Sequence, residues 1–245
     1  MTTDPLAPLL TLADIPSAVN EARERVDGAL RHRALRRRGG RVAAEISLRS
    51  AVASAALEGA VHDREAVRAG TVTDPVLQGA LRVAGALPGL VDLWPKAPRQ
   101  VLAKLHTLAA RGVVDVDLLG RPTADRAVRL NALMALVTGG TAAPPLVLAA
   151  VVHGELLTLR PFAGPSGVVA RAAARLVLMS TGLDPRGLVA VDVGHREREP
   201  EYVGAANAFA TGTPDGVRSW LRHYMRAIEI GAEQITIVGD EVLAG

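Results

Sequence analysis

One stretch of the sequence, residues 159–171, combines residue types that can bind an anion. It reads Leu-Arg-Pro-Phe-Ala-Gly-Pro-Ser-Gly-Val-Val-Ala-Arg and joins two segments with the apolar spacing of helices. The free N–H groups and the positive dipole end at the start of a helix attract anions, and Arg160 and Arg171 add positive charge. Gly164 and Gly167 allow close approach of the backbone to a ligand. The pattern predicts an anion site, with a structural turn bearing surface arginines as the alternative.

Three neighbouring residues bear on this prediction. Ser166 is a good N-cap for the helix that follows the loop. Arg175 lies one turn beyond Arg171 and adds to the positive charge. Pro165, in contrast, removes one N–H donor from the loop.

The same stretch resembles the signature of the Fic/Doc (Fido) family, His-Pro-Phe-x-Asp/Glu-Gly-Asn-Gly-Arg-x-x-Arg. The frame has the right length, and four residues fall on matching positions, namely Pro161, Phe162, Gly167 and Arg171. Members of that family usually transfer AMP from ATP to a protein hydroxyl group. The resemblance covers roughly residues 40–230 and implies an all-α, Fic-type helical bundle.

The side chains that carry the family's chemistry are replaced in this chain. Arg160 stands at the position of the catalytic His, the general base, and a guanidinium stays protonated and can only donate. Gly164 replaces the acid that holds Mg²⁺, an ion that prefers carboxylate oxygen. Ser166 partly replaces the Asn that steadies the phosphates, whereas Val168 does not replace the first Arg. The residues left for a phosphate or nucleotide pocket are Arg160, Gly164, Ser166, Gly167 and Arg171, with no metal ligand among them.

A second match lies about a hundred residues upstream. Ser54-Ala-Ala-Leu-Glu58-Gly59 resembles the inhibitory helix of the Fic class that carries its regulator N-terminally. In that class the inhibitory Glu reaches the last Arg of the motif, and Glu58 and Arg171 fill these positions here. We therefore predict a buried or half-buried salt bridge between them, with an exposed Glu58 before a helix-ending glycine as the alternative.

The histidines do not restore the missing base. His153 precedes Arg160 by seven residues on the same predicted helix, about 10 Å away at 1.5 Å per residue. At that distance it cannot act at the same point, so we expect a packed histidine that hydrogen bonds between helices. His195 and His223 have no motif around them.

Apolar periodicity and Gly/Pro punctuation predict helices along most of the chain. The first expected helix starts near Asp14 and ends at Gly39-Gly40. A helix of about ten residues is expected within 71–98. The other expected helices cover 41–58, 101–110, 123–137, 146–159, 168–181, 200–210 and 214–238. Residues 113–119 are expected to be extended. We assign residues 1–40 to an N-terminal helical extension and residues 41–245 to a Fic-like domain that includes the inhibitory-type helix 41–58. The segment between Gly112 and Pro144 leaves room for only a short flap hairpin, or none.

Composition narrows the class of protein. The 245 residues include no Cys and only 2% aromatic residues, so disulfides, thiolate metal sites and a Cys nucleophile are excluded and a helix-on-helix core of small side chains is expected. No uncharged apolar run approaches the ~20 residues that span a bilayer, and no signal peptide is evident, so we expect a cytoplasmic, bacterial-type protein without a membrane partner.

Six arginines gather between residues 31 and 41 although the net charge of the chain is only +3. They are Arg31, Arg33, Arg36, Arg37, Arg38 and Arg41. Such a cluster can hold phosphate backbones. We favour a solvated helix end with its cations near the helix C-terminus, and nucleic acid is the least favoured partner because no recognition helix or aromatic stacking pattern accompanies the cluster.

These observations lead to one functional interpretation and one alternative. The favoured interpretation is a Fic-fold pseudoenzyme that lacks AMP transfer (AMPylation) and serves as a regulatory or partner-binding module with a vestigial phosphate or nucleotide pocket. The alternative is an active nucleotidyl- or phosphoryl-group transferase that works without the motif histidine. ATP or another nucleotide is the candidate ligand, Mg²⁺ is not expected, and a protein partner or a homodimer is considered.

Overall fold

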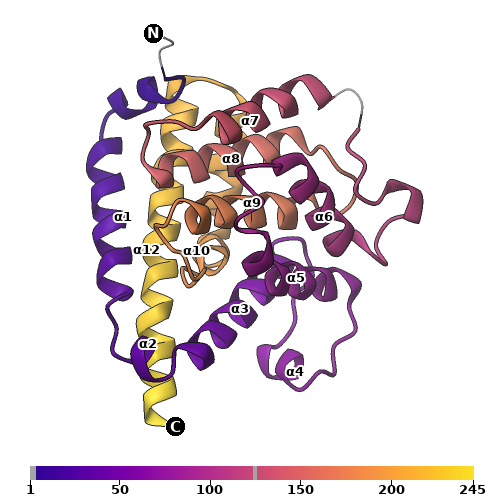
Figure 1. Ribbon diagram of the computed structural model, residues 1–245, viewed down its shortest axis with the longest axis vertical. Helices are drawn as coiled ribbons and strands as arrows, with labels where there is room; N and C mark the ends of the chain where they lie inside the picture. Colours follow the sequence, from indigo (N-terminus) through magenta and orange to yellow (C-terminus); the bar gives the residue numbers. More distant parts are fainter. Residues whose placement is uncertain (1–3, 124–125) are drawn as a thin grey trace.

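The computed structural model describes residues 4–123 and 126–245 and is built from helices (Figure 1). Within these residues there is no β-strand, and the only isolated bridge joins Arg111 to Val114. The α-helices are α1 (Ile15–Ala29), α2 (Ala34–Arg37), α3 (Gly39–Ala56), α4 (Arg64–Arg68), α5 (Pro75–Ala86), α6 (Pro98–Ala110), α7 (Ala127–Gly139), α8 (Pro145–Leu159), α9 (Ser166–Ser180), α10 (Val191–Glu197), α11 (Glu199–Ala210) and α12 (Pro214–Ala244). Short 3₁₀ helices cover Ala7–Thr11, Leu87–Leu90 and Val116–Leu118. The all-α class predicted from the sequence is confirmed.

The centre of the fold is the pair α8 and α9, which pack along each other. α8 begins at Pro145, which suits a first helical turn because its missing N–H has no partner there. Its side chains are apolar nearly all round, and most are buried. α9 is buried on almost every side as well, including Arg171 and Arg175. The loop of interest, residues 160–165, joins these two core helices, so its position is fixed at both ends.

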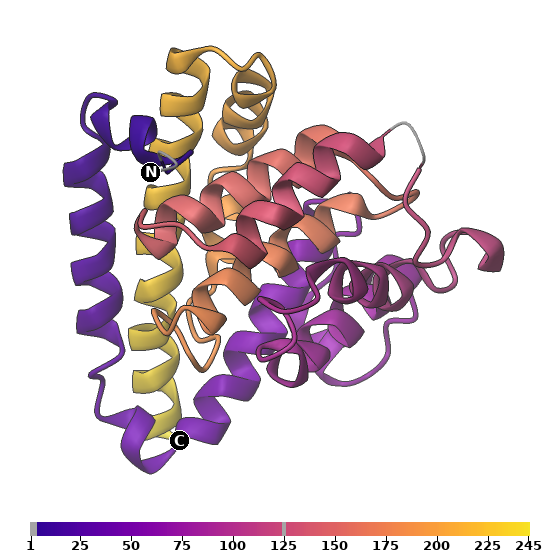
Figure 2. The same ribbon diagram turned by 45° about the horizontal axis from the view of Figure 1, so that its top comes forward.

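The N-terminal helix α1 lies beside the long C-terminal helix α12 (Figures 1 and 2). Its buried residues recur at spacings of three and four and are Ile15, Val19, Ala22 and Val26. They form part of the same hydrophobic core as α8 and α9. The proposed boundary between an extension and a domain at residue 40 stays a prediction.

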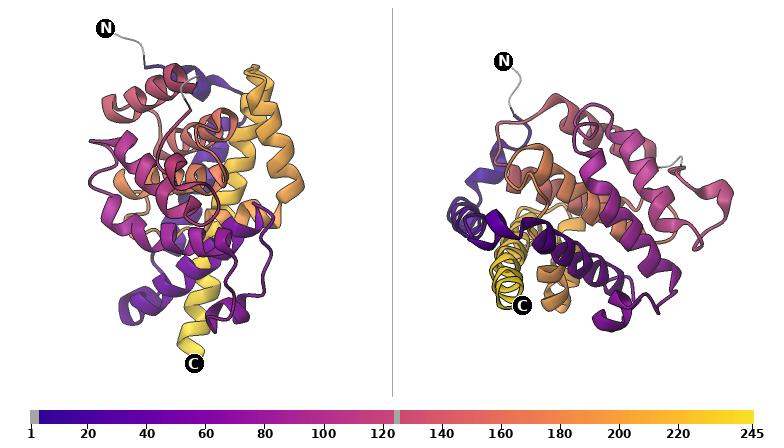
Figure 3. Two further views of the ribbon diagram at one scale, coloured as in Figure 1. Left: turned by 90° about the vertical axis from the view of Figure 1, so that its right-hand side faces the viewer. Right: turned by 60° about the horizontal axis from the view of Figure 1, so that its bottom comes forward.

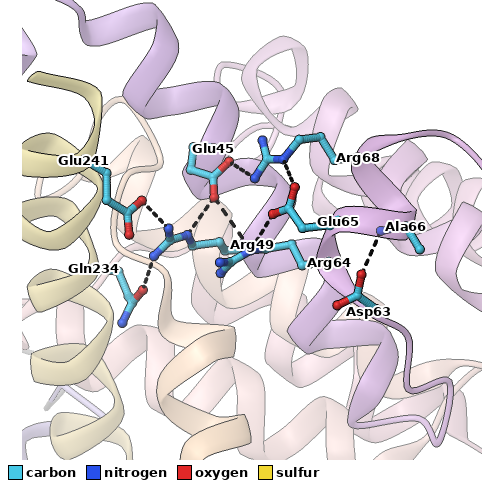
Figure 4. A network of polar contacts seen from close by, with 9 residues as sticks. All are labelled: Glu45, Arg49, Asp63, Arg64, Glu65, Ala66, Arg68, Gln234 and Glu241. Carbon is cyan, nitrogen blue, oxygen red and sulfur yellow. Dashed lines mark hydrogen bonds and ion pairs between the residues drawn. The ribbon is translucent and has the colours of Figure 1, made fainter. Parts of the chain in front are cut away.

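A polar network fixes α3 to α12 and α4 (Figure 4). The guanidinium of Arg49 donates to Glu45 Oε1 at 2.8 Å, to Gln234 Oε1 at 3.0 Å and to Glu241 Oε2 at 2.5 Å. Arg68 on α4 contacts the other oxygen of Glu45 at 2.7 Å. Because Arg49 is buried and its donors are paired, the network holds α3 in one orientation and so sets the position of residues beyond its C-terminal end.

Several predicted boundaries differ from the structure. Gly39-Gly40 does not end the first helix: α1 stops at Ala29, and Gly39 begins α3. A Cβ at Gly39 would lie 2.5 Å from Nη2 of Arg186, so this glycine serves a close contact. α12 likewise runs past the predicted end at Val238 and continues to Ala244. A Cβ at Gly239 within it would overlap Nδ1 of His32.

The region before the loop also differs from the prediction. Residues 113–119 are not extended but hold the bridge at Val114 and the 3₁₀ turn Val116–Leu118. No flap ladder forms in the described part of the segment between α6 and α7, as expected from its length. The predicted start of the next helix at Thr123 borders residues 124–125, which lie outside the described residues, and α7 begins at Ala127. The seven-residue helix α10 was not predicted, because so short a segment carries little apolar periodicity.

Candidate functional site

The loop between α8 and α9 has a strained backbone held from outside by a histidine. Arg160 ends α8 with φ 43° and Gly164 has φ 71°, both in the left-handed region. The ring of His106, on α6, stacks on Phe162 with centroids 4.7 Å apart. Its Nε2 donates to Ala163 O at 2.8 Å, because Nδ1 accepts the N–H of Gly120 at 2.9 Å. Burial lowers the pKa of His106, and the neutral ring pins the loop.

Arg171 lies at the floor of the site and is almost completely buried. Its Nε donates to Ser54 Oγ at 2.9 Å and its Nη2 to Ser54 O at 2.8 Å. Nη2 also donates to Glu58 Oε1 at 2.8 Å, and Nη1 donates to the Tyr202 hydroxyl at 3.2 Å. Asp192 Oδ1 lies 3.6 Å from Nε. Burial by itself lowers the pKa of Arg171, but these oxygens raise it overall, so the guanidinium stays charged.

The salt bridge predicted between Glu58 and Arg171 is present. Glu58 follows the last turn of α3, and its side chain is 17% exposed while that of Arg171 is 1% exposed. A Cβ at Gly167 would overlap Oε1 of Glu58, so the carboxylate rests directly on the first turn of α9. The position at which the sequence predicts an external anion is therefore held by the chain's own carboxylate.

A pocket of about 550 Å³ opens beside this ion pair. It brings together four of the predicted residues, with Glu58, Gly167 and Arg171 next to one another and the exposed Arg160 also in the lining. The remaining lining residues are Leu57, Leu157, Thr158, Tyr202, Val203, Ala206, Asn207 and Ala210. Two arginines and one carboxylate make the pocket suitable for an anion that competes with Glu58.

Other predicted site residues lie elsewhere. Ser166 does not cap α9: it is the first residue of the helix, its side chain is buried, and its Oγ has no hydrogen-bond partner among the described residues. Gly164 does not line the pocket, and a Cβ there would lie 2.7 Å from Cγ1 of Val114. Ser54 supports Arg171 from α3 and does not line the pocket. Gly59 is exposed with φ 90°, as expected for a residue just after a helix.

Arg175 does not contribute charge to the pocket, in contrast to the prediction. Its Nη2 donates to Gly187 O at 3.2 Å, and its Nη1 lies 3.8 Å from Asp192 Oδ2 in the protein interior. The side chain of Arg175, one helical turn after Arg171, therefore points into the core. Its spacing from Arg171 in the sequence does not reveal this direction.

Helix α11 supplies the site residues that the anion-site prediction missed. The Tyr202 hydroxyl accepts from Arg171 and is hydrogen bonded to His153 Nε2 at 3.0 Å. His153 is thus the packed, inter-helix hydrogen-bonding histidine that the sequence predicted, and burial followed by the charge of Arg171 lowers its pKa well below the usual range. Asn207 lines the pocket one turn further on.

His195 and His223 join an aromatic cluster behind the pocket. His195 Nδ1 and His223 Nε2 are 3.0 Å apart, and His195 packs 4.9 Å from the ring of His153. Neither ring lines the pocket. Among the described residues no group of three or more His, Cys, Asp and Glu side chains is arranged to hold a metal ion. In the same part of the chain no helix has the length and apolarity to cross a membrane.

Comparison with solved structures identifies the architecture. The chain superposes on Fic-1 (residues 134–508) from C. elegans with a TM-score of 0.74 and 17% identity, covering 97% of this chain and 76% of that one. The chain has the Fic fold. The E274G variant of the same C. elegans protein gives a TM-score of 0.74 at 17% identity, with 94% of this chain and 74% of that chain covered. A Fic family protein from Desulfovibrio desulfuricans G20 gives 0.63 at 23% identity, over 100% of this chain and 76% of that one.

The sequence itself matches no family profile and no curated protein. The Fic fold predicted from residues 159–171 is nevertheless confirmed by the structural likeness. At these identities the likeness carries the fold and not the activity.

Proposed function

We propose that this Fic-fold protein is a cytoplasmic regulatory or partner-binding module that does not transfer AMP, and that its remaining anion pocket is closed by Glu58. The observation that carries the proposal is the position of Glu58, which pairs with Arg171 and rests on Gly167. An anion reaches this position only when the carboxylate withdraws. In this pocket the carboxylate of Glu58 therefore competes with any external anion for Arg171.

Among the described residues that line the pocket, none is suited to take a proton from a hydroxyl group at neutral pH. Arg160 is a permanent donor. Glu58 is engaged by the guanidinium of Arg171 at 2.8 Å. Burial raises the pKa of the Tyr202 hydroxyl, although Arg171 opposes this shift. No imidazole belongs to the described lining, since His153 lies behind Tyr202. A general base typically contributes ~10²–10⁴ to a rate, and that contribution is missing.

The residues present do not fit a Mg²⁺ ion. Gly164 stands at the position of the family's metal-binding acid, and a Cβ there would lie 2.7 Å from Cγ1 of Val114. Its φ of 71° is also a conformation that residues with side chains rarely adopt. A carboxylate side chain at this position would therefore be strained and would crowd Val114. No step of a metal-assisted transfer is supported by these residues.

The pocket does fit a phosphate group once Glu58 has moved. Arg171 keeps its donors, and the first turn of α9 offers backbone N–H groups with the positive end of the helix dipole. Arg160 is exposed and lines the pocket, where it can add a second guanidinium. Binding of a phosphate-bearing ligand without metal, coupled to release of Glu58, is the behaviour that we propose.

Isothermal titration calorimetry tests the binding half of the proposal. Inorganic phosphate, AMP and ATP are titrated with and without Mg²⁺ into the wild type, Glu58→Ala and a matched control, Glu233→Ala, which removes an exposed carboxylate from α12. We expect Glu58→Ala to bind at least tenfold more tightly than the wild type, about 1.4 kcal/mol, with no dependence on Mg²⁺. Equal affinities in all three proteins would contradict the internal competition.

A transfer assay tests the other half. Labelled ATP is incubated with cell lysate and either the wild type or Glu58→Ala. We expect no labelled protein in either case, because removing Glu58 supplies neither a base nor a metal ligand. Labelling by Glu58→Ala would overturn the proposal and support a transferase that works by a mechanism without the motif histidine.

A further inference from the structure

A second charged surface lies at the α2 end of the molecule. The six arginines between residues 31 and 41 are all exposed. Within the described residues, none has a carboxylate within 4.0 Å. We call this surface the arginine patch, and its members are Arg31, Arg33, Arg36, Arg37, Arg38 and Arg41. Six unpaired cations within eleven residues, with no acidic residue between them, form a strongly positive surface.

The neighbouring arginines are arranged differently. Arg49, Arg64 and Arg68 lie close by on α3 and α4 and all contact Glu45, with further carboxylates around them (Figure 4). Asp240 on α12 faces His32 at 3.3 Å. Arg41 shares a hollow with Glu45 and Glu241, but both of these carboxylates pair with Arg49. The fold therefore neutralises the arginines that connect its helices and leaves those of the patch free.

Helix electrostatics explains only part of the patch. Cations near a helix C-terminus are favourable, and this was the interpretation that the sequence favoured. It holds for Arg31, which directly follows the end of α1, and for Arg36, Arg37 and Arg38 at the end of α2, where Arg38 is the C-cap. It does not hold for Arg41, which lies in the first turn of α3, a turn with no acidic residue and no side-chain cap. Cations at the start of an 18-residue helix destabilise it.

The tertiary structure adds a seventh guanidinium. Arg186, from the connection between α9 and α10, is exposed and packs against Gly39 in the first turn of α3. The patch lies beside the C-terminal end of α12 (Figures 1 and 3). Glu58 lies beyond the opposite end of α3, about 27 Å away along 18 residues at 1.5 Å each. The patch is therefore separate from the Glu58 pocket.

We propose that the arginine patch binds the phosphate backbone of nucleic acid without sequence preference. Guanidinium groups match the geometry of phosphate oxygens, and several of them along one surface suit a polymer of phosphates. A membrane surface fits less well, because interfacial segments pair basic residues with large apolar ones. Within the described residues, none of the exposed large hydrophobic side chains falls in 31–41. Base readout is not expected, since the patch has no aromatic side chain.

Fluorescence anisotropy with labelled DNA and RNA duplexes of about 30 base pairs tests this proposal. For the full chain we expect the logarithm of the binding constant to fall with the logarithm of salt concentration, with a slope between about −3 and −5. The variant Arg36→Gln/Arg37→Gln/Arg41→Gln should bind at least tenfold more weakly at about 50 mM salt, with a slope shallower by about 3. Duplexes of different sequence should bind equally.

The matched control keeps the change in net charge but moves it elsewhere. Arg23→Gln/Arg129→Gln/Arg226→Gln replaces three surface arginines that pair with carboxylates, and it should bind as the wild type does. Circular dichroism verifies that both variants are folded. Absence of binding to either duplex, an equal loss in the control, or binding to phosphatidylserine vesicles in place of duplexes would each overturn the proposal. None of these results bears on the Glu58 pocket.

Discussion

Replacing Glu58 by alanine removes the carboxylate that faces the buried guanidinium of Arg171. Removal of one partner from a buried ion pair costs about 3–5 kcal/mol, because the other charge is left uncompensated. Two features favour the lower end of this range. Asp192 remains 3.6 Å from Arg171, and Glu58 is 17% exposed, so water can enter from the pocket. We expect a loss of about 3 kcal/mol, which for a chain of this size lowers Tm by about 6–12 °C.

Urea denaturation and differential scanning calorimetry measure this loss. Glu58→Gln should fall between the wild type and Glu58→Ala, since the amide oxygen still accepts from Arg171 but carries no charge. Glu233→Ala should stay within about 0.5 kcal/mol of the wild type. Inorganic phosphate at about a hundred times its dissociation constant should restore up to about 2.7 kcal/mol to Glu58→Ala, because it replaces the missing negative charge.

Two results would refute this reasoning. A loss below about 1 kcal/mol for Glu58→Ala would mean that the ion pair with Arg171 does not anchor the end of α3. Phosphate that stabilises the wild type as much as Glu58→Ala would mean that the anion binds away from the position of Glu58.

Three further predictions concern single positions. Gly167→Ala should destabilise the wild type by about 1–3 kcal/mol because its Cβ overlaps Glu58, and far less in the Glu58→Ala background, a coupling that a double-mutant cycle measures. Burial lowers the pKa of His223 from 6.5 to about 4, so only the unfolded chain takes up this proton between these values. Stability should therefore fall by up to about 1.4 kcal/mol per pH unit as pH drops below about 6.5, and urea titrations should show a smaller dependence for His223→Gln. Arg41→Glu should stabilise the protein by about 1 kcal/mol at low salt, because it replaces a cation by an anion in the first turn of α3, and no gain in Tm would contradict this.

The helices could be predicted from the sequence to the extent that local signals define them. Pro145 and the left-handed glycines at 112 and 182 mark helix ends that the structure reproduces. Where a glycine serves a distant contact, the same signal misleads. Gly39-Gly40 looks like a helix end, but Gly39 begins α3 and packs against Arg186 from another part of the chain.

The candidate site could be predicted only in part. The spacing of Glu58 and Arg171 relative to the Fic-like motif was sufficient to predict their salt bridge, which the structure contains. The support for the loop by His106 was not visible, because this residue stands more than fifty positions upstream with no motif around it. The contact by which Val114 crowds a side chain at position 164 was not predicted either. It depends on the turn at residues 113–119, which was predicted to be extended.

The sequence by itself therefore determined the helical class and the loop between α8 and α9, because backbone preference and side-chain chemistry are local properties. Only the tertiary structure decided which groups meet at that loop. It placed the carboxylate of Glu58 on Gly167 and turned Arg175 into the core, because side-chain direction and long-range packing depend on the relative positions of whole helices. The same packing left the arginine patch exposed at the opposite end of α3.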